Sequence, residues 1–597
     1  VGDCGPVIRR VCQTGRSTDV DITIGHLRAG EKINFTVGPA GLVAEDKITF
    51  DYSMAYQDKP SLNEQIDTAL ASRQSSLTLR PGRYYQPGGS SKLLLEGVRN
   101  FDIFGEGVKI IMRDWDIAFH MIDCDNVSVS GLTIDYDPLA YSQGVIKDID
   151  TVEETIDLRV DNYYPVENWT APDRIAIHNP ETGLLKYGGR MLTAESIERL
   201  GPDTWRLHLY RLAQAAEIGD VLTCRMVRAG RTFRMHRCTN LDIDSVTLYG
   251  GASYGFYETE GSNNVYNNLK VVPGPKHPLA DRPRFRSSGA DGFHSRMAEV
   301  GPKVYNSTFD SCGDDGMAVN GFWGFVVDQS SDNEILCALF SDVHWPGHNV
   351  RIGRYEDSTI ADRTITSVDY WDMNKAEIAA FLETRQPELV QKNIRYLANL
   401  IYDGQAVEVE PMDLVMNTDR NGFGFEFCNN TIQNTNSRAI IVKSNGLVSG
   451  NTIYHTINPG ILIYPTVNGS RKESGFINDL VIQDNTIKDC GYWEPDDNIL
   501  RRTGGLCILS DAIQWGANWH HNIVISNNVF EDIIRGPNIL LTNATNTQIT
   551  SNTFRDTHRQ PGSGGTDFGV ESDSVIWLDR VNRVSLSDNR LENPGPY

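Results

Sequence analysis

The sequence predicts an all-β chain wound into a right-handed parallel β-helix. The first observation is a short phrase that recurs in the C-terminal half: NNTI at 429, GNTI at 450, DNTI at 484, NNVF at 527, SNTF at 551 and DNRL at 588. The second is that short strands such as LVIQ and IVIS precede several copies and alternate apolar with polar residues. The third is the spacing of 21 residues from Asn430 to Asn451 and 24 from Asn528 to Asn552, within the range of roughly 20 to 50 typical of solenoids.

The recurring asparagine suits a tight turn in each coil. Asn tolerates left-handed backbone geometry, and its amide can hydrogen-bond its neighbour in the stack. The same strand pattern occurs in the first half, in VSVSGLTID, LDIDSVTLYG and PKVYNSTFDS. An antiparallel β-sandwich with Asn-rich turns is the alternative, but sandwiches do not repeat one phrase at coil-length intervals.

A helix is predicted to cap the first coil, because the open end of a solenoid needs a cover. Ser61 and Glu64 form a capping box in residues 61–72, ahead of apolar residues at helical spacing. The strand SLTLRPGRYY then opens the first coil. Residues 1–60 are an N-terminal extension without an assigned role.

Two stretches interrupt the coils and are predicted to be insertions. Residues 145–230 contain short strands and turn signals, which favours an inserted, β-barrel-like domain. Residues 325–418 form the second, with a helix predicted after the capping box of Asn374 and Glu377 and continued through LVQKNIRYLANLI. The solenoid coils are then assigned as follows: 61–144, 231–324 and 419–597.

Composition narrows the partners. The net charge of −23 and the pI near 5.0 disfavour nucleic acid, because phosphate contacts need surplus Lys and Arg. No apolar run reaches the roughly 18 to 20 residues of a membrane-spanning helix, so no membrane partner is expected. The ten cysteines lack zinc-site spacing, and Cys4 and Cys12 are predicted to pair as a disulfide.

The chain is expected to be secreted and extracellular. It starts at Val1 without Met and without a charged, then apolar leader, as after removal of a signal peptide. It also contains possible N-glycosylation acceptors. These are Asn34, Asn126, Asn168, Asn306, Asn429, Asn468 and Asn543.

The candidate catalytic residues are three aspartates. Asp314 and Asp315 lie side by side in SCGDDGMAVNG, and Asp291, 23 residues earlier, lies about one coil away. Stacked strands are about 4.8 Å apart, so the three carboxylates are expected to crowd on one surface. In a straight strand Asp314 and Asp315 would point to opposite faces, and one of them would enter the core. The glycines at 313 and 316 are expected to let the backbone bend, so that both aspartates stay out of the core.

Crowded carboxylates suit acid–base chemistry. At least one should have a raised pKa and hold a proton near neutral pH. Inverting glycoside hydrolysis needs a carboxylic acid for the leaving oxygen and a carboxylate roughly 6.5 to 9.5 Å away that activates water. A solvated turn, or a calcium site of carboxylates and carbonyls, is the structural alternative.

The motifs GADGFHS and CGDDGMAVNG resemble those of the family 110 glycoside hydrolases, which are inverting α-1,3-galactosidases. The later stretches SRAIIVKSNGLVSGNTI and GILIYPTVNGSRKESGFINDLVIQDNTIKDC also resemble that family. The resemblance implies a pectin-lyase-like β-helix with small inserted β-domains and an exo-acting enzyme that removes terminal α-linked galactose. It implies an oligo- or polysaccharide substrate, with no cofactor and no metal.

The resemblance also implies roles for individual residues. Asp314 corresponds to the general acid, and Asp315 and Asp291 correspond to the pair that positions and deprotonates water. His294 and Asn320 correspond to small polar and aromatic residues beside these motifs, although this chain reads DDGMAVNG where the family usually reads like DDPINVHG.

Other substrate-binding candidates come from residue type. Trp323 and Trp345 could stack on sugar faces, with core packing as the alternative. Glu473, beside Arg471 and Lys472, could bind substrate or form a solvated ion pair, and Arg438 is a further candidate for substrate binding.

Two further functions are weighed. Polygalacturonases resemble the chain in an Asp one coil before an Asp pair, and WPGHNVRIGR and SRAIIVKS look similar to their Gly-His and Arg-x-Lys motifs. However, Arg438 and Lys443 are five residues apart rather than two, and His348 lies in the second predicted insertion. A non-catalytic carbohydrate-binding β-helix is the other alternative. The RPRFR stretch at 282–286 could hold an acidic or sulfated sugar or be solvated.

Overall fold

The computed structural model describes most of the chain from Pro60 onward. The described ranges are 60–86, 92–165, 172–226, 230–354, 359–467, 473–475, 477–492, 504–510, 519–534, 536–559, 570–571 and 573–596. Before Pro60 it describes the backbone of an antiparallel sheet, in which β1 (Val7–Val11) pairs with β2 (Ile22–Thr23) and β3 (Ile48–Asp51). The predicted Cys4–Cys12 disulfide lies outside the described residues.

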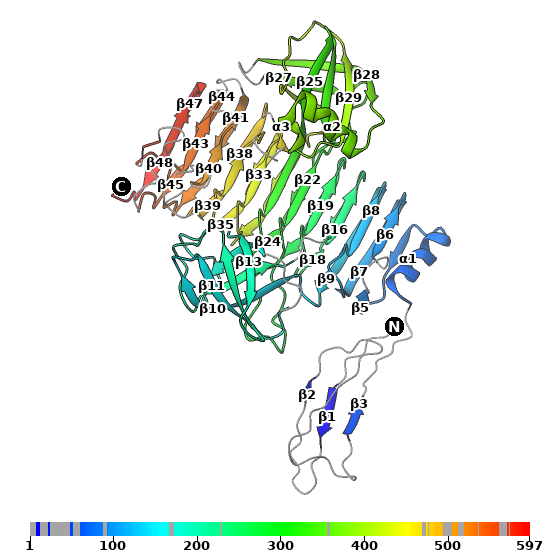
Figure 1. Cartoon of the computed structure of the whole chain (residues 1–597), viewed down its shortest axis with the longest axis vertical. Coiled ribbons are helices and arrows are strands. Elements are labelled where there is room, and N and C mark those ends of the chain that lie inside the picture. The colour runs from blue at the N-terminus through cyan, green and yellow to red at the C-terminus, as the bar shows by residue number, and fades with distance from the viewer. Residues whose placement is uncertain are drawn as a thin grey trace.

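The main body is a parallel β-helix, which confirms the predicted fold class. Its strands form three ladders, and in each ladder a strand pairs in parallel with its equivalent in the next coil (Figure 1). The first ladder is β4 (Ser76–Thr78), β7 (Arg99–Met112), β9 (Asp125–Tyr136), β17 (Asp242–Asp244), β20 (Val265–Asn267), β23 (Lys303–Tyr305), β31 (Phe425–Cys428), β34 (Gly446–Ser449), β38 (Leu480–Gln483), β41 (His520–Ser526), β44 (Ala544–Thr550) and β47 (Asn582–Ser587). The second is β5 (Gly82–Gln86), the second halves of β7 and β9, β18 (Thr247–Leu248), β21 (Lys270–Val271), β24 (Thr308–Asp310), β32 (Thr431–Gln433), β35 (Thr452–Thr456), β39 (Thr486–Cys490), β42 (Val529–Glu531), β45 (Thr553–Arg555) and β48 (Arg590–Glu592). The third is β6 (Leu93–Glu96), β8 (Phe119–Ile122), β16 (Phe233–His236), β19 (Phe256–Thr259), β22 (Phe293–Arg296), β25 (Met317–Ser331), β33 (Ile440–Val442), β36 (Ile461–Ile463), β40 (Leu506–Ile508), β43 (Ile539–Thr542) and β46 (Ile576–Asp579).

In the recurring phrase, two adjacent residues have different structural roles. The first adopts the left-handed conformation, with φ of 58° at both Asn429 and Asp484. The second is a buried asparagine that accepts hydrogen bonds from its equivalent in the preceding coil. For example, the backbone N–H and the side-chain amide of Asn451 both donate to Oδ1 of Asn485, at 2.9 Å. The asparagine ladder therefore satisfies buried backbone donors at every turn, as buried polar groups require.

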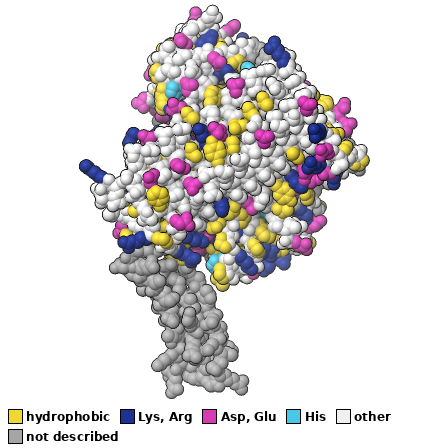
Figure 2. All heavy atoms as spheres, turned by 180° about the vertical axis from the view of Figure 1, so that it is seen from behind, with side chains coloured by type: hydrophobic (Ala, Val, Ile, Leu, Met, Phe, Trp, Pro, Cys, Tyr) yellow, Lys and Arg dark blue, Asp and Glu magenta, His cyan; other side chains and the backbone are white. Residues whose placement is uncertain are grey.

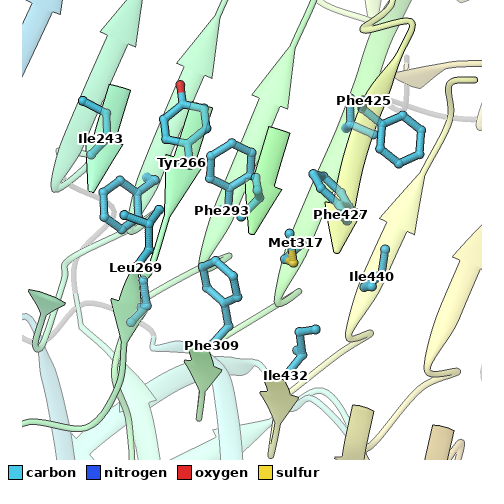
Figure 3. Packing of buried hydrophobic residues seen from close by; sticks show 14 of the residues in the cluster. Ile243, Tyr266, Leu269, Phe293, Phe309, Met317, Phe425, Phe427, Ile432 and Ile440 are labelled. Carbon is cyan, nitrogen blue, oxygen red and sulfur yellow. The ribbon is translucent and has the colours of Figure 1, made fainter. Parts of the chain in front are cut away.

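Inside the coils, apolar side chains stack from one coil to the next. Phe293 packs edge-on against Tyr266 at a ring-centroid distance of 4.8 Å and against Phe427 at 6.2 Å (Figure 3). Outward-facing residues alternate with these, as the strand period of two requires. The third ladder therefore has a continuous outer face, and that face carries the site described below.

Helix α1 (Leu62–Ala71) covers the first coil, as predicted. The side chain of Ser61 accepts from the backbone N–H of Glu64, and Glu64 accepts from the N–H of Ser61. Its buried face includes Ile66 and Ala69, which join the solenoid core. The capping box is confirmed.

A sheet between β9 and β16 corresponds to the first interruption. β10 (Tyr141–Asp150), β11 (Thr155–Val160), β12 (Asp173–His178), β13 (Ala194–Arg199), β14 (Thr204–Leu209) and β15 (Val221–Arg225) are antiparallel. They pair in the order β12-β15-β10-β11-β14-β13 around their own apolar core. In Figure 1 this first inserted domain lies below the middle of the solenoid.

A second inserted domain grows out of β25 and lies at the opposite side of the solenoid (Figure 1). β25, β26 (Glu334–Leu339), β29 (Tyr396–Tyr402), β28 (Ile360–Tyr370), β27 (Asn349–Gly353) and β30 (Leu414–Asn417) pair antiparallel in that order and close on β25. The remaining elements are α2 (Lys375–Arg385), α3 (Pro387–Val390), a 3₁₀ turn at Thr418–Arg420 and β37 (Glu473–Ser474), which pairs with β25.

The helix predicted across LVQKNIRYLANLI is wrong. The capping box of Asn374 and Glu377 is present at the start of α2, but helix α3 ends at Val390. Asn393 then adopts a φ of 61°, and the segment from Tyr396 becomes strand β29. Pairing with β26 and β28 buries this aromatic and aliphatic segment, and tertiary context overrides its helical pattern.

The surface carries both signs of charge. Figure 2 shows acidic and basic side chains interspersed over the face seen from behind. Among the described residues no helix is both long and apolar enough to cross a bilayer.

Candidate active site

The solenoid register places three candidate residues at equivalent positions in successive coils. Asp291 precedes β22 by two residues, Asp315 precedes β25 by two, and Arg438 precedes β33 by two. Backbone hydrogen bonds join these turns: the N–H of Gly292 donates to the carbonyl of Asp315, and that of Gly316 to the carbonyl of Arg438. The coil spacing seen in the sequence therefore stacks these side chains.

The glycines beside the aspartates are required for space. A Cβ on Gly316 would lie 2.4 Å from the side chain of Ile432 and 2.6 Å from the carbonyl of Ala439. A Cβ on Gly313 would lie 2.6 Å from the carbonyl of Ser288. Neither glycine adopts a positive φ, so the close approach of neighbouring coils, rather than a special backbone conformation, accounts for glycine at both positions.

The three carboxylates come together. One oxygen from each of Asp291, Asp314 and Asp315 lies within 4.8 Å of the others. We refer to these residues as the carboxylate triad. Asp291 and Asp315 are buried, with exposed fractions of 3% and 5%, and the Asp314 side chain is 17% exposed. Asp314 is therefore the member most open to solvent.

Two arginines neutralise the triad from different domains. Arg174, on strand β12 of the first inserted domain, donates to Asp314 at 2.6 Å, and its other terminal nitrogen is 3.9 Å from Asp291. Arg438, on the solenoid, donates to Asp315 at 2.9 Å through its guanidinium and at 3.1 Å through its backbone N–H. Arg174 has a φ of 49°, and Arg286 and Asn436 both donate to its carbonyl. The left-handed backbone at Arg174 is thus held by neighbouring side chains.

His294 connects the triad to a second charged group. Its Nδ1 lies 2.5 Å from an oxygen of Asp291, and its Nε2 accepts from Nε of Arg296 at 2.8 Å. Asn320 contacts the same Nε2, with its side-chain oxygen at 2.9 Å. The neutral tautomer with the proton on Nδ1 matches the contacts to Asp291 and Arg296.

Glu473 closes this network and is not the solvated ion pair considered above. It accepts from Lys443 at 2.6 Å and from Arg296 at 3.3 Å. Burial raises the pKa of Glu473, but the charges of Lys443 and Arg296 outweigh it and hold the pKa well below its usual range. Glu473 therefore stays ionised and anchors the two cations.

Burial sets the protonation of the triad. It raises the pKa of Asp291 to about 7, and the charge of Asp314 adds to this effect. It also raises the pKa of Asp315 to about 7, although Arg438 opposes the rise. Burial lowers the pKa of His294 to about 3, helped by Arg296. The site therefore retains a carboxyl proton near neutral pH while the imidazole is uncharged.

The triad is also a donor set of the kind that hard divalent cations accept. Arg174 and Arg438 already hold an oxygen of Asp314 and of Asp315. These guanidinium groups supply positive charge where such a cation would bind, so the arrangement fits acid–base chemistry better than a metal centre.

Trp323 is not a surface residue. Its side chain is fully buried, and its ring lies 6.2 Å from that of Trp519 in the core beside α2 and α3. The expectation that it stacks on a sugar is therefore corrected. Trp345 is 42% exposed and lies under the guanidinium of Arg420.

The glycosylation acceptors differ in accessibility. Asn126, Asn306 and Asn429 are exposed, the first in strand β9 and the other two just after strands. Asn543 is fully buried, so its proposed modification is inconsistent with the folded chain. Asn34, Asn168 and Asn468 lie outside the described residues.

Sequence reasoning missed Arg174 and Arg296. Arg296 follows His294 by two residues and so shares its strand face, a signal that could have been used. Arg174 stands in the first inserted domain, 140 residues before Asp314, and no local pattern connects the two.

Comparison with known proteins gives distant relatives. No protein-family model matches the chain. The chain is 21% identical to α-1,3-galactosidase B of Bacteroides thetaiotaomicron over 530 residues, 84% of this chain and 80% of that protein. It is 22% identical to α-1,3-galactosidase A of Bacteroides fragilis over 424 residues, 67% of this chain and 65% of that protein.

Three solved structures illustrate the structural matches. The catalytic domain of a family 87 α-1,3-glucanase in complex with nigerose has a TM-score of 0.42 at 10% identity, over 90% of this chain and 64% of that one. An exopolygalacturonase of Thermotoga maritima has a TM-score of 0.34 at 10% identity, over 89% and 88%. The A-module of the mannuronan C-5 epimerase AlgE4 of Azotobacter vinelandii has a TM-score of 0.31 at 11% identity, over 90% and 93%. In sequence, the chain is a distant relative of two α-1,3-galactosidases.

Proposed function

We propose that this chain is an exo-acting, inverting glycoside hydrolase that removes terminal α-linked galactose, or a closely related sugar, from glycans or polysaccharides. The carboxylate triad is the observation that carries the proposal, because it brings three carboxyl groups within 4.8 Å and burial raises the pKa of two of them to about 7. The distant relationship to two α-1,3-galactosidases supports the choice of sugar.

The reaction needs one proton donor and one proton acceptor. A carboxylic acid of the triad gives its proton to the glycosidic oxygen as the bond from that oxygen to the anomeric carbon breaks. A water held by ionised carboxylates attacks the anomeric carbon and passes a proton to one of them. Arg174 and Arg438 hold the resulting negative charges in place.

The separation of the carboxylates makes the stereochemistry a sharp test. The oxygens are closer than the roughly 6.5 to 9.5 Å between carboxyl groups usual in inverting enzymes, and retaining enzymes have roughly 5 to 5.5 Å. Inversion requires the water to attack the face of the anomeric carbon opposite the leaving oxygen, so the acidic and the basic carboxyl group must act on opposite faces of the sugar ring. Proton NMR of α-1,3-galactobiose hydrolysis should show β-galactose before mutarotation. Initial α-galactose would overturn inversion and indicate a carboxylate nucleophile.

Two observations assign the acid differently. The resemblance of CGDDG to the family motif places it at Asp314, which is also the triad member most open to solvent. The pKa of about 7 at both Asp291 and Asp315 instead places the available proton on one of these two residues.

Leaving-group dependence distinguishes these assignments. Each of Asp291→Asn, Asp314→Asn and Asp315→Asn should lower turnover of α-1,3-galactobiose by about 10²-fold or more. With an activated aryl α-galactoside, whose leaving group needs no proton, only the variant of the acid should recover. Asp123→Asn, an exposed position, is the matched control and should keep full activity. A fully active Asp314→Asn protein on both substrates would contradict the family-derived role.

The polygalacturonase-like alternative finds less support. Arg438 contacts Asp315 and Lys443 contacts Glu473, so the two do not act on one point. His348 lies in the second inserted domain, where it contacts Asn417. A rapid loss of pectin viscosity would restore this alternative. Sugar binding without any product would favour a non-catalytic carbohydrate-binding protein.

A further inference from the structure

A second polar group lies on the outer face of the third ladder, toward the N-terminal side of the triad. It consists of His120 on β8, Arg234 on β16, and Arg231 just before β16, and we refer to it as the basic cluster. Arg234 pairs in register with His120 on one side and with Tyr257 on the other, and Tyr257 pairs with His294. At about 4.8 Å per coil, Arg234 is about 10 Å from His294. The cluster and the triad therefore share one surface.

The two arginines of the basic cluster form no ion pair within the described residues, and the acidic charge that acts on His120 is that of Asp116. Within the ranges that the structure describes, the Nε of each arginine is buried without a hydrogen-bond partner. Both ring nitrogens of His120 are also buried and unpartnered, in a residue that is only 6% exposed. Burying a polar group without a hydrogen-bond partner costs free energy, so such a group is not a stabilising feature of the fold.

Neighbouring arginines show that this arrangement is unusual for the chain. Arg237, at the end of the same segment, forms a two-pronged pair with Asp123. The RPRFR stretch was considered above as a site for an acidic sugar. In the structure Arg282 forms an ion pair with Asp161, and Arg284 forms one with Asp135. Among the described residues, Arg286 of the same stretch has no carboxylate partner either, but it is 1% exposed and donates to the backbone carbonyl of Arg174.

Mutual repulsion within the cluster also affects the acid–base properties of its members. Burial lowers the pKa of Arg234, and the charge of Arg231 lowers it further. Burial likewise lowers the pKa of His120 to about 4, with Arg234 as the next cause. An anion placed between these groups would relieve both effects.

Aromatic rings connect the cluster to the triad. The guanidinium of Arg231 lies 4.9 Å from the ring centroid of Tyr257 and 5.9 Å from that of Tyr254. The Tyr254 ring in turn lies 5.3 Å from that of His294. Tyr257 is only 7% exposed, but Tyr254 is partly exposed, so the Tyr254 ring can contact the apolar face of a sugar that lies between the triad and the cluster.

We propose that the basic cluster binds an anionic group, a uronate carboxylate or a sulfate ester, on a sugar unit adjoining the bond that is cut. The proposal rests on the proposed function, because it assumes that a glycan occupies the triad. Arg side chains recognise both anions through paired N–H donors. The substrate class is then an acidic glycan with a terminal α-linked galactose or similar sugar.

The test is a binding measurement that does not depend on turnover. Isothermal titration of the Asp314→Asn protein would use three α-galactosyl oligosaccharides of one backbone: neutral, uronate-containing and sulfated. The two anionic ligands distinguish the carboxylate from the sulfate, and tighter binding of either one by about tenfold or more supports the proposal. The Arg231→Gln/Arg234→Gln double variant should lose that preference and keep its affinity for the neutral ligand. Arg237→Gln, which removes a paired surface arginine, is the matched control and should keep the preference.

Two further readouts make the result decisive. The preference should shrink as salt is raised, because it is electrostatic. The melting temperature of the double variant should be equal to or above that of the wild type, since the change removes two partly buried cations that repel each other. Equal affinity for neutral and anionic ligands, or a preference that survives the double substitution, would overturn the proposal. Galactose release by the wild-type protein is assayed separately, so failure of hydrolysis and failure of the anion site are distinguished.

Discussion

Around the carboxylate triad, each buried charge lies against an opposite charge delivered by a different segment. Arg174 comes from the first inserted domain, Arg438 from the next coil, and Glu473 from the segment that pairs with β25. Burying an unpaired ion costs several kcal/mol, which is comparable to the whole free energy of unfolding of many proteins. These buried ion pairs are therefore better explained by function than by stability. The protonation of the triad carboxyl groups should respond to single substitutions among their partners.

Arg174 should tune the triad from the first inserted domain. Its charge lowers the pKa of Asp291, so Arg174→Gln should raise that pKa by about 1 unit or more. The alkaline limb of the kcat/KM profile, expected near pH 7 in the wild type, should move to higher pH by the same amount while kcat/KM falls. Arg174→Lys keeps the charge and should shift the limb less. An unchanged limb in both variants would show that Arg174 only supports the local structure.

Asp291 should destabilise the fold as the pH rises. Its folded pKa of about 7 exceeds the ordinary value of about 3.9, so its contribution to stability is fully present below pH 3.9 and is lost as pH rises through 7. The melting temperature of Asp291→Asn relative to wild type should therefore increase between about pH 4 and pH 8.

Asp123 provides a control of opposite sign. Its hydrogen bonds from Arg237 lower the pKa of its carboxyl group, so its contribution is present above the ordinary pKa and is lost as the pH falls. Asp123→Asn should thus lose stability relative to wild type toward neutral pH. Parallel trends in the two variants would contradict the assigned shifts.

The site could be predicted only where its residues share a coil period. Asp291 and Asp314 lie 23 residues apart, and both belong to turns that stack, so spacing alone brings them together. Arg174 reaches Asp314 through the docking of a separate sheet, and no sequence period encodes that docking. Trp323 shows that residue type alone is also insufficient. A tryptophan can stack on a sugar or pack in the core, and only the packing of the folded chain shows that Trp323 is buried.

At the scale of the elements, the asparagine ladder is the most regular device in the chain. Asn485 accepts from Asn451, donates to Asn528 at 2.9 Å, and donates to the carbonyl of Val448 at 3.0 Å. The repeated phrase made this element predictable, although its left-handed residue is the one before the ladder asparagine. Strand β29 was not predictable in the same way, since its pattern fits a helix until β26 and β28 pair with it.

Asn485→Ala should be strongly destabilising for this reason. It leaves the backbone and side-chain donors of Asn451 without their buried acceptor, at about 1–3 kcal/mol for each unsatisfied group. Urea unfolding should show a loss of at least about 2 kcal/mol. Gln548→Ala, an exposed position on β44, should stay within about 0.5 kcal/mol of wild type. Equal losses of unfolding free energy in the two variants would show that the asparagine ladder makes no special contribution to stability.

For the molecule as a whole, the solenoid supplies the carboxylates and the first inserted domain supplies Arg174. One group of the contacts that dock this domain on the coils lies around Leu185 and Tyr187. The backbone N–H of Leu185 donates to Asn434 at 2.7 Å, the carbonyl of Leu185 is 2.7 Å from Nε2 of His455, and Tyr187 donates to Asp489 at 2.7 Å. The other ring nitrogen of His455 lies 2.6 Å from Asp489. His455 therefore joins the inserted domain to the coil that carries it.

Loosening this contact should act on catalysis at a distance. His455→Leu removes both polar contacts, so the domain should hold Arg174 less firmly and kcat/KM should fall by about tenfold, equivalent to about 1.4 kcal/mol. Asn485→Ala also lowers stability but does not touch the domain. Assayed well below its melting temperature, this variant should therefore keep the kcat/KM of the wild type. If His455 acts through Arg174, His455→Leu should have little further effect in an Arg174→Gln background. The same tenfold loss in both backgrounds would show that the two residues act independently, and that the inserted domain does more at the site than deliver its arginine.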